Sequence, residues 1–171
     1  MTWYDTITGR AWVFGDDIDT DQIIQGRYLT LLDYSEMAKH TLEIPRPEFA
    51  DEVEEDDVIV AGKNFGGGSS REEAPQVIKE SGVGCVVAES FARIFYRNAI
   101  NIGLPIMRIE ETSSIPDAAE VEVSLESATL TIKDSGDTIS GEPLPSVMKD
   151  ILQAGGAIPW FRKMRNENGF P

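Results

Sequence analysis

The segment from Gly62 to Glu72, with three consecutive glycines, most constrains how this chain can fold. The apolar run Val58-Ile59-Val60-Ala61 before it is typical of a buried strand, and residues 71–81 after it are predicted to be helical. Glycines between a strand and a helix allow positive φ angles and let a ligand approach the backbone closely. The first N–H groups of a helix, with its partial positive charge, attract anions. The segment therefore predicts an anion pocket.

Ser69, Ser70 and Arg71 at the end of this segment add two hydroxyls and a planar guanidinium suited to a carboxylate or phosphate. An alternative is plain helix capping, because Ser69 with Glu72, and Ser70 with Glu73, fit the Ser-x-x-Glu pattern. No bulky side chain separates the end of the strand from the guanidinium, which favours the pocket. The segment does not match a P-loop, a dinucleotide fingerprint or a serine-hydrolase elbow.

The apolar pattern predicts an α/β fold in one domain, residues 1–171, with a mixed, mainly parallel core sheet and flanking helices. Alternation of apolar and polar residues adds an antiparallel β-hairpin. The predicted strands are 10–15, 57–61, 83–88, 104–109, 121–125 and 129–132, and the predicted helices are 34–42, 71–81, 90–102, 146–154 and 159–165.

Charge and composition exclude some classes of function. The chain has 30 acidic against 15 basic residues, a net charge of −15, which argues against nucleic acid as a partner. We interpret the acidic run Asp51–Asp57 as a solvated loop. No apolar stretch is long enough to span a membrane, and residues 1–5 do not resemble a signal peptide. Together with a single cysteine, Cys85 in an apolar run, this predicts a cytoplasmic protein with no disulfide.

The chain is also expected to bind no metal of its own. Iron–sulfur clusters need several cysteine thiolates, and Cys85 is more typical of a buried packing residue. The alternating Asp17, Asp19 and Asp21 do not form an EF-hand, because the positions for glycine and glutamate hold Gln22 and Tyr28.

Three blocks in order, Asp16–Ile24, Gly62–Glu72 and Glu89–Pro105, resemble the small subunits of aconitase-type hydro-lyases, in particular those of 3-isopropylmalate dehydratase and homoaconitase. The resemblance covers nearly the whole chain and implies a swivelling-domain-like β/β/α fold. Two positions depart from the family pattern: Gly67, where cysteine is frequent, and Glu73, where histidine is common.

The resemblance implies a hydro-lyase subunit that is inactive alone. Its partner would be a large subunit that carries a 4Fe–4S cluster, in a heterodimer or heterotetramer. The reaction would isomerise a 2-substituted malate by dehydration and rehydration. Ser69 would be the catalytic base, and Ser70 and Arg71 would bind a substrate carboxylate.

Within this family the segment Tyr28-Leu29-Thr30-Leu31 is expected to contact the substrate tail. Homoaconitase-type subunits carry an arginine after the Tyr-Leu pair, whereas this chain has Thr30, then Leu31. An apolar tail is therefore favoured, which means isopropylmalate and leucine biosynthesis. Homoaconitase stays open because Arg27 is adjacent, as does a hydro-lyase for several 2-alkylmalates. A different class, a non-catalytic carboxylate-binding module, is distinguished by whether a cysteine-bearing partner exists.

Overall fold

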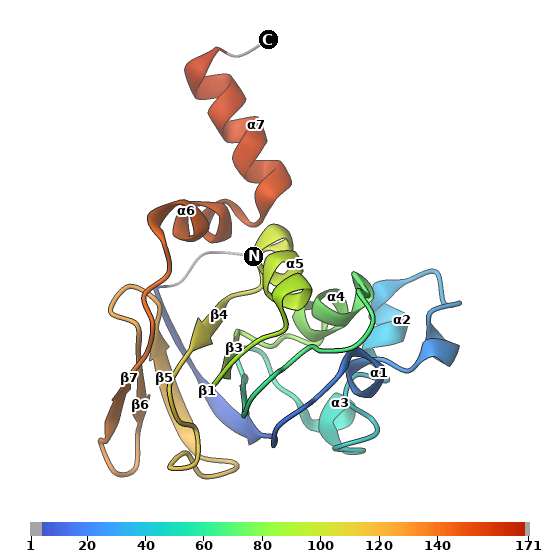
Figure 1. Cartoon of the computed structure of the whole chain (residues 1–171), viewed down its shortest axis with the longest axis vertical. Coiled ribbons are helices and arrows are strands. Elements are labelled where there is room, and N and C mark those ends of the chain that lie inside the picture. The colour runs from blue at the N-terminus through green and yellow to red at the C-terminus, as the bar shows by residue number, and fades with distance from the viewer. Residues whose placement is uncertain (1–4, 170–171) are drawn as a thin grey trace.

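The computed structural model describes residues 5–169, and their strands form one seven-stranded sheet in the order β4-β3-β2-β1-β5-β6-β7 (Figure 1). The strands are β1 (Thr6–Val13), β2 (Val58–Ala61), β3 (Cys85–Ala88), β4 (Ile106–Arg108), β5 (Glu120–Ser124), β6 (Thr129–Ile132) and β7 (Thr138–Ser140). Strands β1 to β4 pair in parallel, whereas the pairs β1–β5, β5–β6 and β6–β7 are antiparallel. The predicted mixed sheet with an added hairpin is confirmed.

The described residues also form helices, all but the last of which lie on the face of the parallel strands that is opposite to β5–β7, whereas the last extends away from the sheet (Figure 1). They are α1 (Thr20–Ile23), the 3-10 helix η1 (Gly26–Tyr28), α2 (Tyr34–Ala38), α3 (Phe49–Glu52), α4 (Glu73–Glu80), α5 (Arg93–Ile102), α6 (Ser146–Ala154) and α7 (Ala157–Asn168). Helices α4 and α5 follow β2 and β3, so they form the crossovers that parallel strands require.

Strand β1 joins the two halves of the sheet. Its residues 6–10 pair with β5, and its residues 11–13 pair with β2. The sheet then curls until its two edges approach each other, because Ile109, just after β4, forms an antiparallel bridge with Gly141, just after β7. Curling lets β5–β7 cover one face of the parallel strands while the helices cover the other.

Two hydrophobic cores result from the alternation of side chains along the strands. Ile59 and Val86 face the helices and pack with residues such as Phe95. Val60 and Val87 face the other way, against the apolar side of β5 and β6. Because both faces are covered, the parallel strands read as continuous apolar runs in the sequence. Cys85 is fully buried in the second core, as predicted.

Several predicted boundaries were wrong. The helix predicted over 34–42 ends at Ala38, because the chain turns so that buried Leu42 adopts a left-handed φ of 55° and its N–H reaches the Ile23 carbonyl. The strand predicted over 10–15 is Thr6–Val13, and its first residues are held by β5. Strand β7 and helix α3 were not predicted, since each is only three or four residues long.

The acidic run Asp51–Asp57 is not simply a solvated loop. Asp57 is 3% exposed, and its carboxylate accepts hydrogen bonds from the Trp12 indole (2.9 Å) and from the backbone N–H groups of Arg10 and Glu54 (both 3.0 Å). A buried carboxylate is tolerated where several donors surround it. The last residue of the run therefore ties β1 to the chain entering β2.

Candidate functional site

The candidate site is built from three loops that leave the carboxyl ends of β1, β2 and β3. Backbone hydrogen bonds join them: the Gly66 N–H donates to Ile18 (2.7 Å), the Thr20 N–H to Gly67 (2.8 Å), and the Ala92 N–H to Phe65 (2.9 Å). The loops thus continue the pairing of the parallel strands beyond the sheet. In open parallel sheets this edge is where ligands bind.

Gly66 is required at the centre of this arrangement. Its φ is +82°, and a Cβ there would lie 2.3 Å from the Phe95 ring. Any side chain would therefore push α5 away from the loop. Asn64, two residues earlier, also has a positive φ of 56°, and its side-chain amide donates to the Asp17 carboxylate at 3.1 Å. The loop is held in one conformation by contacts from both neighbouring loops.

Ser69 is not a helix cap. Helix α4 begins at Glu73, its N-cap is Glu72, and the cap makes no side-chain hydrogen bond. The predicted start at residue 71 was therefore too early. Instead, the Ser69 Oγ lies 3.3 Å from the Oγ1 of Thr20, which is 2% exposed. This hydroxyl pair links the exposed loop to the segment after β1, so the geometry does not support capping for Ser69.

Arg71 is fixed by the same segment. Its Nη1 donates to the Ile24 carbonyl at 2.9 Å and lies 2.5 Å from a carboxylate oxygen of Asp21. Both contacts involve Nη1, which leaves the rest of the planar guanidinium and its N–H groups for a ligand. The side chain is only partly exposed. A guanidinium held in this way is oriented before a substrate arrives.

A pocket of about 180 Å³ brings these groups together. It is lined by Thr20, Gly66, Gly68, Ser69, Ser70, Arg71, Ala92, Arg93, Ile94 and Phe95. The three residues predicted from the glycine-rich segment, Ser69, Ser70 and Arg71, therefore share one cavity. Arg93 at the start of α5 adds a second guanidinium to the lining. A small cavity with two cations and several hydroxyls suits a small carboxylic acid.

None of the residues of the predicted tail-reading segment, Tyr28 to Leu31, is in the lining of this cavity. Leu29 and Leu31 pack against the helix-side core, and the exposed Thr30 donates its hydroxyl to the Arg27 carbonyl at 3.3 Å. Tyr28 stacks on His40 with ring centroids 3.7 Å apart. Desolvation, followed by the neighbouring Glu43, raises the pKa of Tyr28, so its hydroxyl stays protonated at neutral pH.

Arg27 points to other partners. Its guanidinium lies 4.7 Å from the centroid of the Tyr28 ring and 4.0 Å from the Glu43 carboxylate. The Arg27 side chain is 66% exposed, so both contacts lie at the protein surface. The alternative in which Arg27 reads a carboxylate tail would require it to leave both.

Within residues 5–169, no group of three or more histidine, cysteine or acidic residues is arranged to hold a metal ion. Cys85 is buried, and burial raises the pKa of its thiol, so it is not disposed to bind a cluster as a thiolate. The residues of this chain therefore do not fit an iron–sulfur cluster of its own. In the same part of the chain, no helix is long and apolar enough to cross a membrane.

Two pocket residues escaped the sequence analysis. Thr20 lies in the block Asp16–Ile24, and Arg93 lies in the block Glu89–Pro105. Both blocks contributed to the family resemblance, but no sequence pattern marked these two residues as part of a site. The hydrogen bonds between the loops bring both residues next to the glycine segment. Among residues close in sequence to Thr20, Asp19 and Gln22 form a capping box that fixes α1.

Comparisons with known proteins identify the family of this chain. Residues 17–112, which hold all three loops, match the family described as aconitase C-terminal domain. A 3-isopropylmalate dehydratase small subunit of Methanopyrus kandleri is 54% identical over 160 residues, 93% of this chain and 94% of that protein. A protein of the same description from Methanosarcina mazei is 50% identical over 159 residues, 93% of this chain and 98% of its own length.

Two matches to Methanocaldococcus jannaschii, one by sequence and one by structure, extend the comparison. A protein named isopropylmalate/citramalate isomerase small subunit is 45% identical over 163 residues and covers 95% of this chain and 97% of its own length. A crystal structure described as 3-isopropylmalate dehydratase has a TM-score of 0.92 at 44% identity and covers 96% of this chain and 98% of that one. The chain therefore belongs to the aconitase C-terminal domain family, among the small subunits of aconitase-type hydro-lyases.

Proposed function

We propose that this chain is the small subunit of a 3-isopropylmalate dehydratase, which interconverts 2- and 3-isopropylmalate by dehydration and rehydration in leucine biosynthesis. The observation that carries the proposal is the cavity in which the exposed Ser69 hydroxyl and the oriented Arg71 guanidinium meet. Relatives that match nearly the whole chain bear names of this activity. The single buried cysteine fits a reducing cytoplasm.

Ser69 is the proposed base. During dehydration a proton leaves the carbon next to a substrate carboxylate, and during rehydration it returns. A serine oxygen accepts such a proton only when its alkoxide is stabilised. The Thr20 hydroxyl, 3.3 Å away, can donate to that oxygen. Closure of the pocket by a second subunit would exclude water and strengthen this interaction.

Ser70 and Arg71 are the proposed carboxylate ligands. The guanidinium is held at Nη1 by Asp21 and the Ile24 carbonyl, so its free N–H groups can bind a carboxylate in a fixed orientation. Ser70 is exposed in the same cavity. Positioned in this way, a substrate presents the carbon next to its carboxylate to Ser69, and orientation by such clamps contributes strongly to the rate.

The large subunit is the proposed partner, in a heterodimer or heterotetramer. Because the residues of this chain do not fit a cluster, we assign the 4Fe–4S cluster to the large subunit, where it supplies a Lewis acid for the departing hydroxyl. Membership in this family favours an enzyme subunit over a non-catalytic binding module.

The substrate tail is proposed to be apolar. The predicted tail-reading segment offers the apolar side chains of Leu29 and Leu31, and the adjacent Arg27 already contacts Tyr28 and Glu43. An unpaired carboxylate tail in a closed site would be costly. This favours isopropylmalate over homoaconitate. A range that includes citramalate is the second candidate, because one relative is named for both substrates.

Reconstitution tests the proposal. The purified chain alone should be colourless and inactive, and activity on isopropylmalate should appear when a cluster-bearing large subunit is added without oxygen. Turnover by this chain alone would refute the division of labour between two subunits. Higher kcat/KM for homoaconitate than for isopropylmalate in the assembled enzyme would refute the assignment of the substrate tail.

A further inference from the structure

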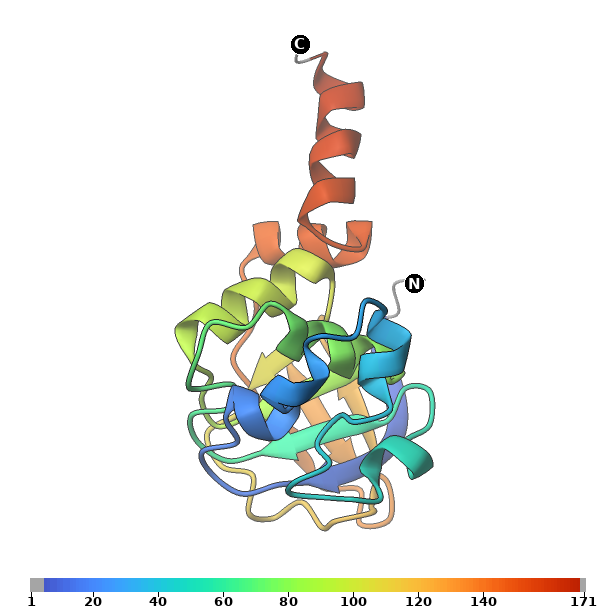
Figure 2. The ribbon, with the colours of Figure 1, turned by 90° about the vertical axis from the view of Figure 1, so that its right-hand side faces the viewer.

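Helix α7 projects from the body of the molecule. Figures 1 and 2 show it in two perpendicular views, in both of which it points away from the sheet and the helices that cover the sheet. It is twelve residues long, and none of them is buried. A helix of this length extends about 18 Å. Most helical stability in proteins comes from packing of an apolar face, so an isolated projecting helix of three turns needs a partner.

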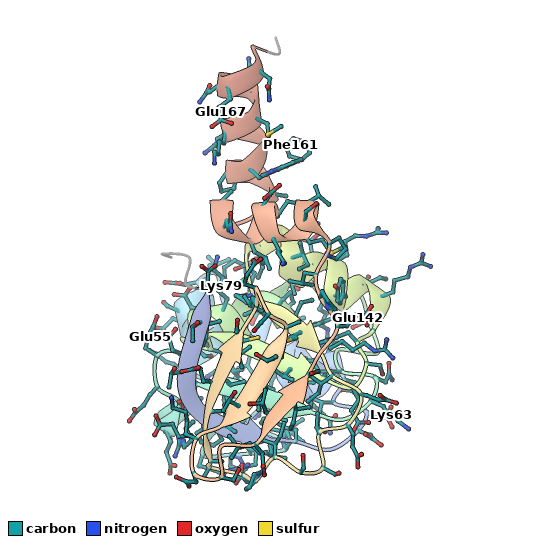
Figure 3. The ribbon with its side chains drawn as sticks, turned by 90° about the vertical axis from the view of Figure 1, so that its left-hand side faces the viewer. Glu55, Lys63, Lys79, Glu142, Phe161 and Glu167 are labelled. Atoms are coloured by element: carbon teal, nitrogen blue, oxygen red, sulfur yellow. The ribbon has the colours of Figure 1, made fainter. Side chains whose placement is uncertain are left out.

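The helix has an apolar face that is largely exposed within residues 5–169. Ile158 is 66% exposed and Phe161 is 64% exposed, and Met164 follows one turn later. The spacing of three residues places these side chains along one side of the helix. In Figure 3 the Phe161 side chain projects from the side of α7, clear of the body of the molecule. Large exposed aromatic and aliphatic residues in a row are typical of an interface.

The charge of α7 is opposite to that of the rest of the chain. The helix carries three basic residues, Arg162, Lys163 and Arg165, and one acidic residue, Glu167, whereas the whole chain has a net charge of −15. A basic helix on an acidic protein is electrostatically complementary to another copy of that protein. This complementarity favours a second copy of the chain as the partner.

A groove at the base of α7 offers the receiving surface. It has a volume of about 320 Å³ and is lined by Tyr34, Glu72, Gln76, Asn98, Asn101, Ile102, Ala157 and Ile158. Its lining combines apolar surface with the carboxylate of Glu72. Because the groove adjoins the first turn of α7, two copies related by a two-fold axis can place each α7 over the other copy's groove, with the two helices antiparallel.

We infer that α7 is a self-association element: two copies of this chain dimerise with their α7 helices antiparallel along the Ile158–Phe161–Met164 face. The Phe161–Met164 part of each helix enters the groove of the other copy, where that copy's own Ile158 forms part of the lining. The basic side chains near the end of each helix then lie close to Glu72 of the other copy. Every contact occurs twice, so the buried area doubles. This association is independent of the catalytic proposal, because the groove and the catalytic pocket share no catalytic residue.

Sedimentation velocity of the full-length chain at several concentrations tests the inference. The chain should sediment as a dimer, and Phe161→Asp should yield a monomer. Loss of an aromatic anchor weakens an interface by about thirtyfold, and each dimer loses two, so the dissociation constant should rise about a thousandfold. Val147→Asp is the matched control, because Val147 is an exposed apolar residue of α6 outside the groove. It should leave the dimer intact.

A mixing experiment tests reciprocity. Asn101→Arg places a bulky cation in the groove at an exposed helix position and should also give a monomer. An equimolar mixture of Phe161→Asp and Asn101→Arg should recover a weaker dimer, because one helix and one groove are intact in each mixed pair. An Asn101→Arg chain that stays dimeric would show that α7 does not use the groove, and two monomeric variants that fail to associate on mixing would refute reciprocal insertion.

Circular dichroism checks that each variant is folded, and salt supplies a further readout, since screening should weaken a dimer that relies on opposite charges. Two results would overturn the inference. One is a wild-type chain that stays monomeric up to about 100 µM, because the dissociation constant of a specific dimer should lie below that concentration. The other is the finding that substitutions in α7 weaken binding of the large subunit but leave self-association of the chain unchanged.

Discussion

Replacing Ser69 with alanine separates catalysis from stability more sharply than any other change to this site. Among the described residues, the Ser69 side chain makes one hydrogen bond, to Thr20 at 3.3 Å, and it caps no helix. A bond of this kind contributes about 0.5–1.5 kcal/mol, and at this length the lower end applies. For a domain of this size, the melting temperature of Ser69→Ala should therefore fall by no more than about 4 °C.

The loss of activity should be much larger. Removal of a positioned proton-transfer group typically lowers the rate by about 10²–10⁴-fold, equivalent to about 3–5 kcal/mol in the transition state. We therefore expect Ser69→Ala to lower kcat by at least a factor of about 10² and to change KM little, since Arg71 still holds the carboxylate.

The assay is steady-state kinetics of the assembled enzyme on 2-isopropylmalate, with thermal unfolding of the same preparations. Ser146→Ala, an exposed serine at the start of α6, is the control and should change neither quantity. A Ser69→Ala enzyme with near-normal kcat but a clearly lowered melting temperature would show that the residue is structural, and the assignment of the base would fail.

Three further predictions concern other residues. Arg71→Lys should raise KM about ten- to a hundredfold with a smaller effect on kcat, because lysine lacks the planar fork; an unchanged KM in steady-state kinetics would contradict this role. Thr30→Arg should shift the ratio of kcat/KM toward homoaconitate by about ten- to a hundredfold, measured on both substrates, whereas no shift would place tail recognition elsewhere. Asp57→Asn should lower the free energy of unfolding, measured in denaturant, by about 2–4 kcal/mol, because an amide N–H group then faces buried donors such as the Trp12 indole. An unchanged free energy of unfolding would show that these hydrogen bonds contribute little to stability.

The glycine segment and its three polar residues could be predicted because their chemistry is local. Strand, glycines, serines and arginine follow one another within fourteen residues, from Val58 to Arg71, so their proximity is imposed by the chain itself. The parallel strands were found for a similar reason: both of their faces are buried, so each appears as an unbroken apolar run.

Other features depended on contacts between distant segments. Whether Ser69 caps a helix could not be decided from Ser-x-x-Glu, because the pattern fits both arrangements, and the bonds from Thr20 and Gly67 determine where the loop lies. The same holds for Asp57, which looked like one more solvated acid until Trp12 and Arg10 were brought to it by the pairing of β1 with β2.

The sequence by itself determined the sheet's parallel half, the glycine loop, the family resemblance and the limit that one cysteine sets on cluster binding. The tertiary structure alone decided which residues share the pocket, which of two guanidiniums lines it and which helix face is exposed in the described part of the chain. The physical reason is that periodicity and composition record whether a residue is buried, but not which neighbour buries it. Arg27 and Arg71 are equally charged in the sequence; only the fold stacks one on Tyr28 and directs the other into the cavity with Ser69.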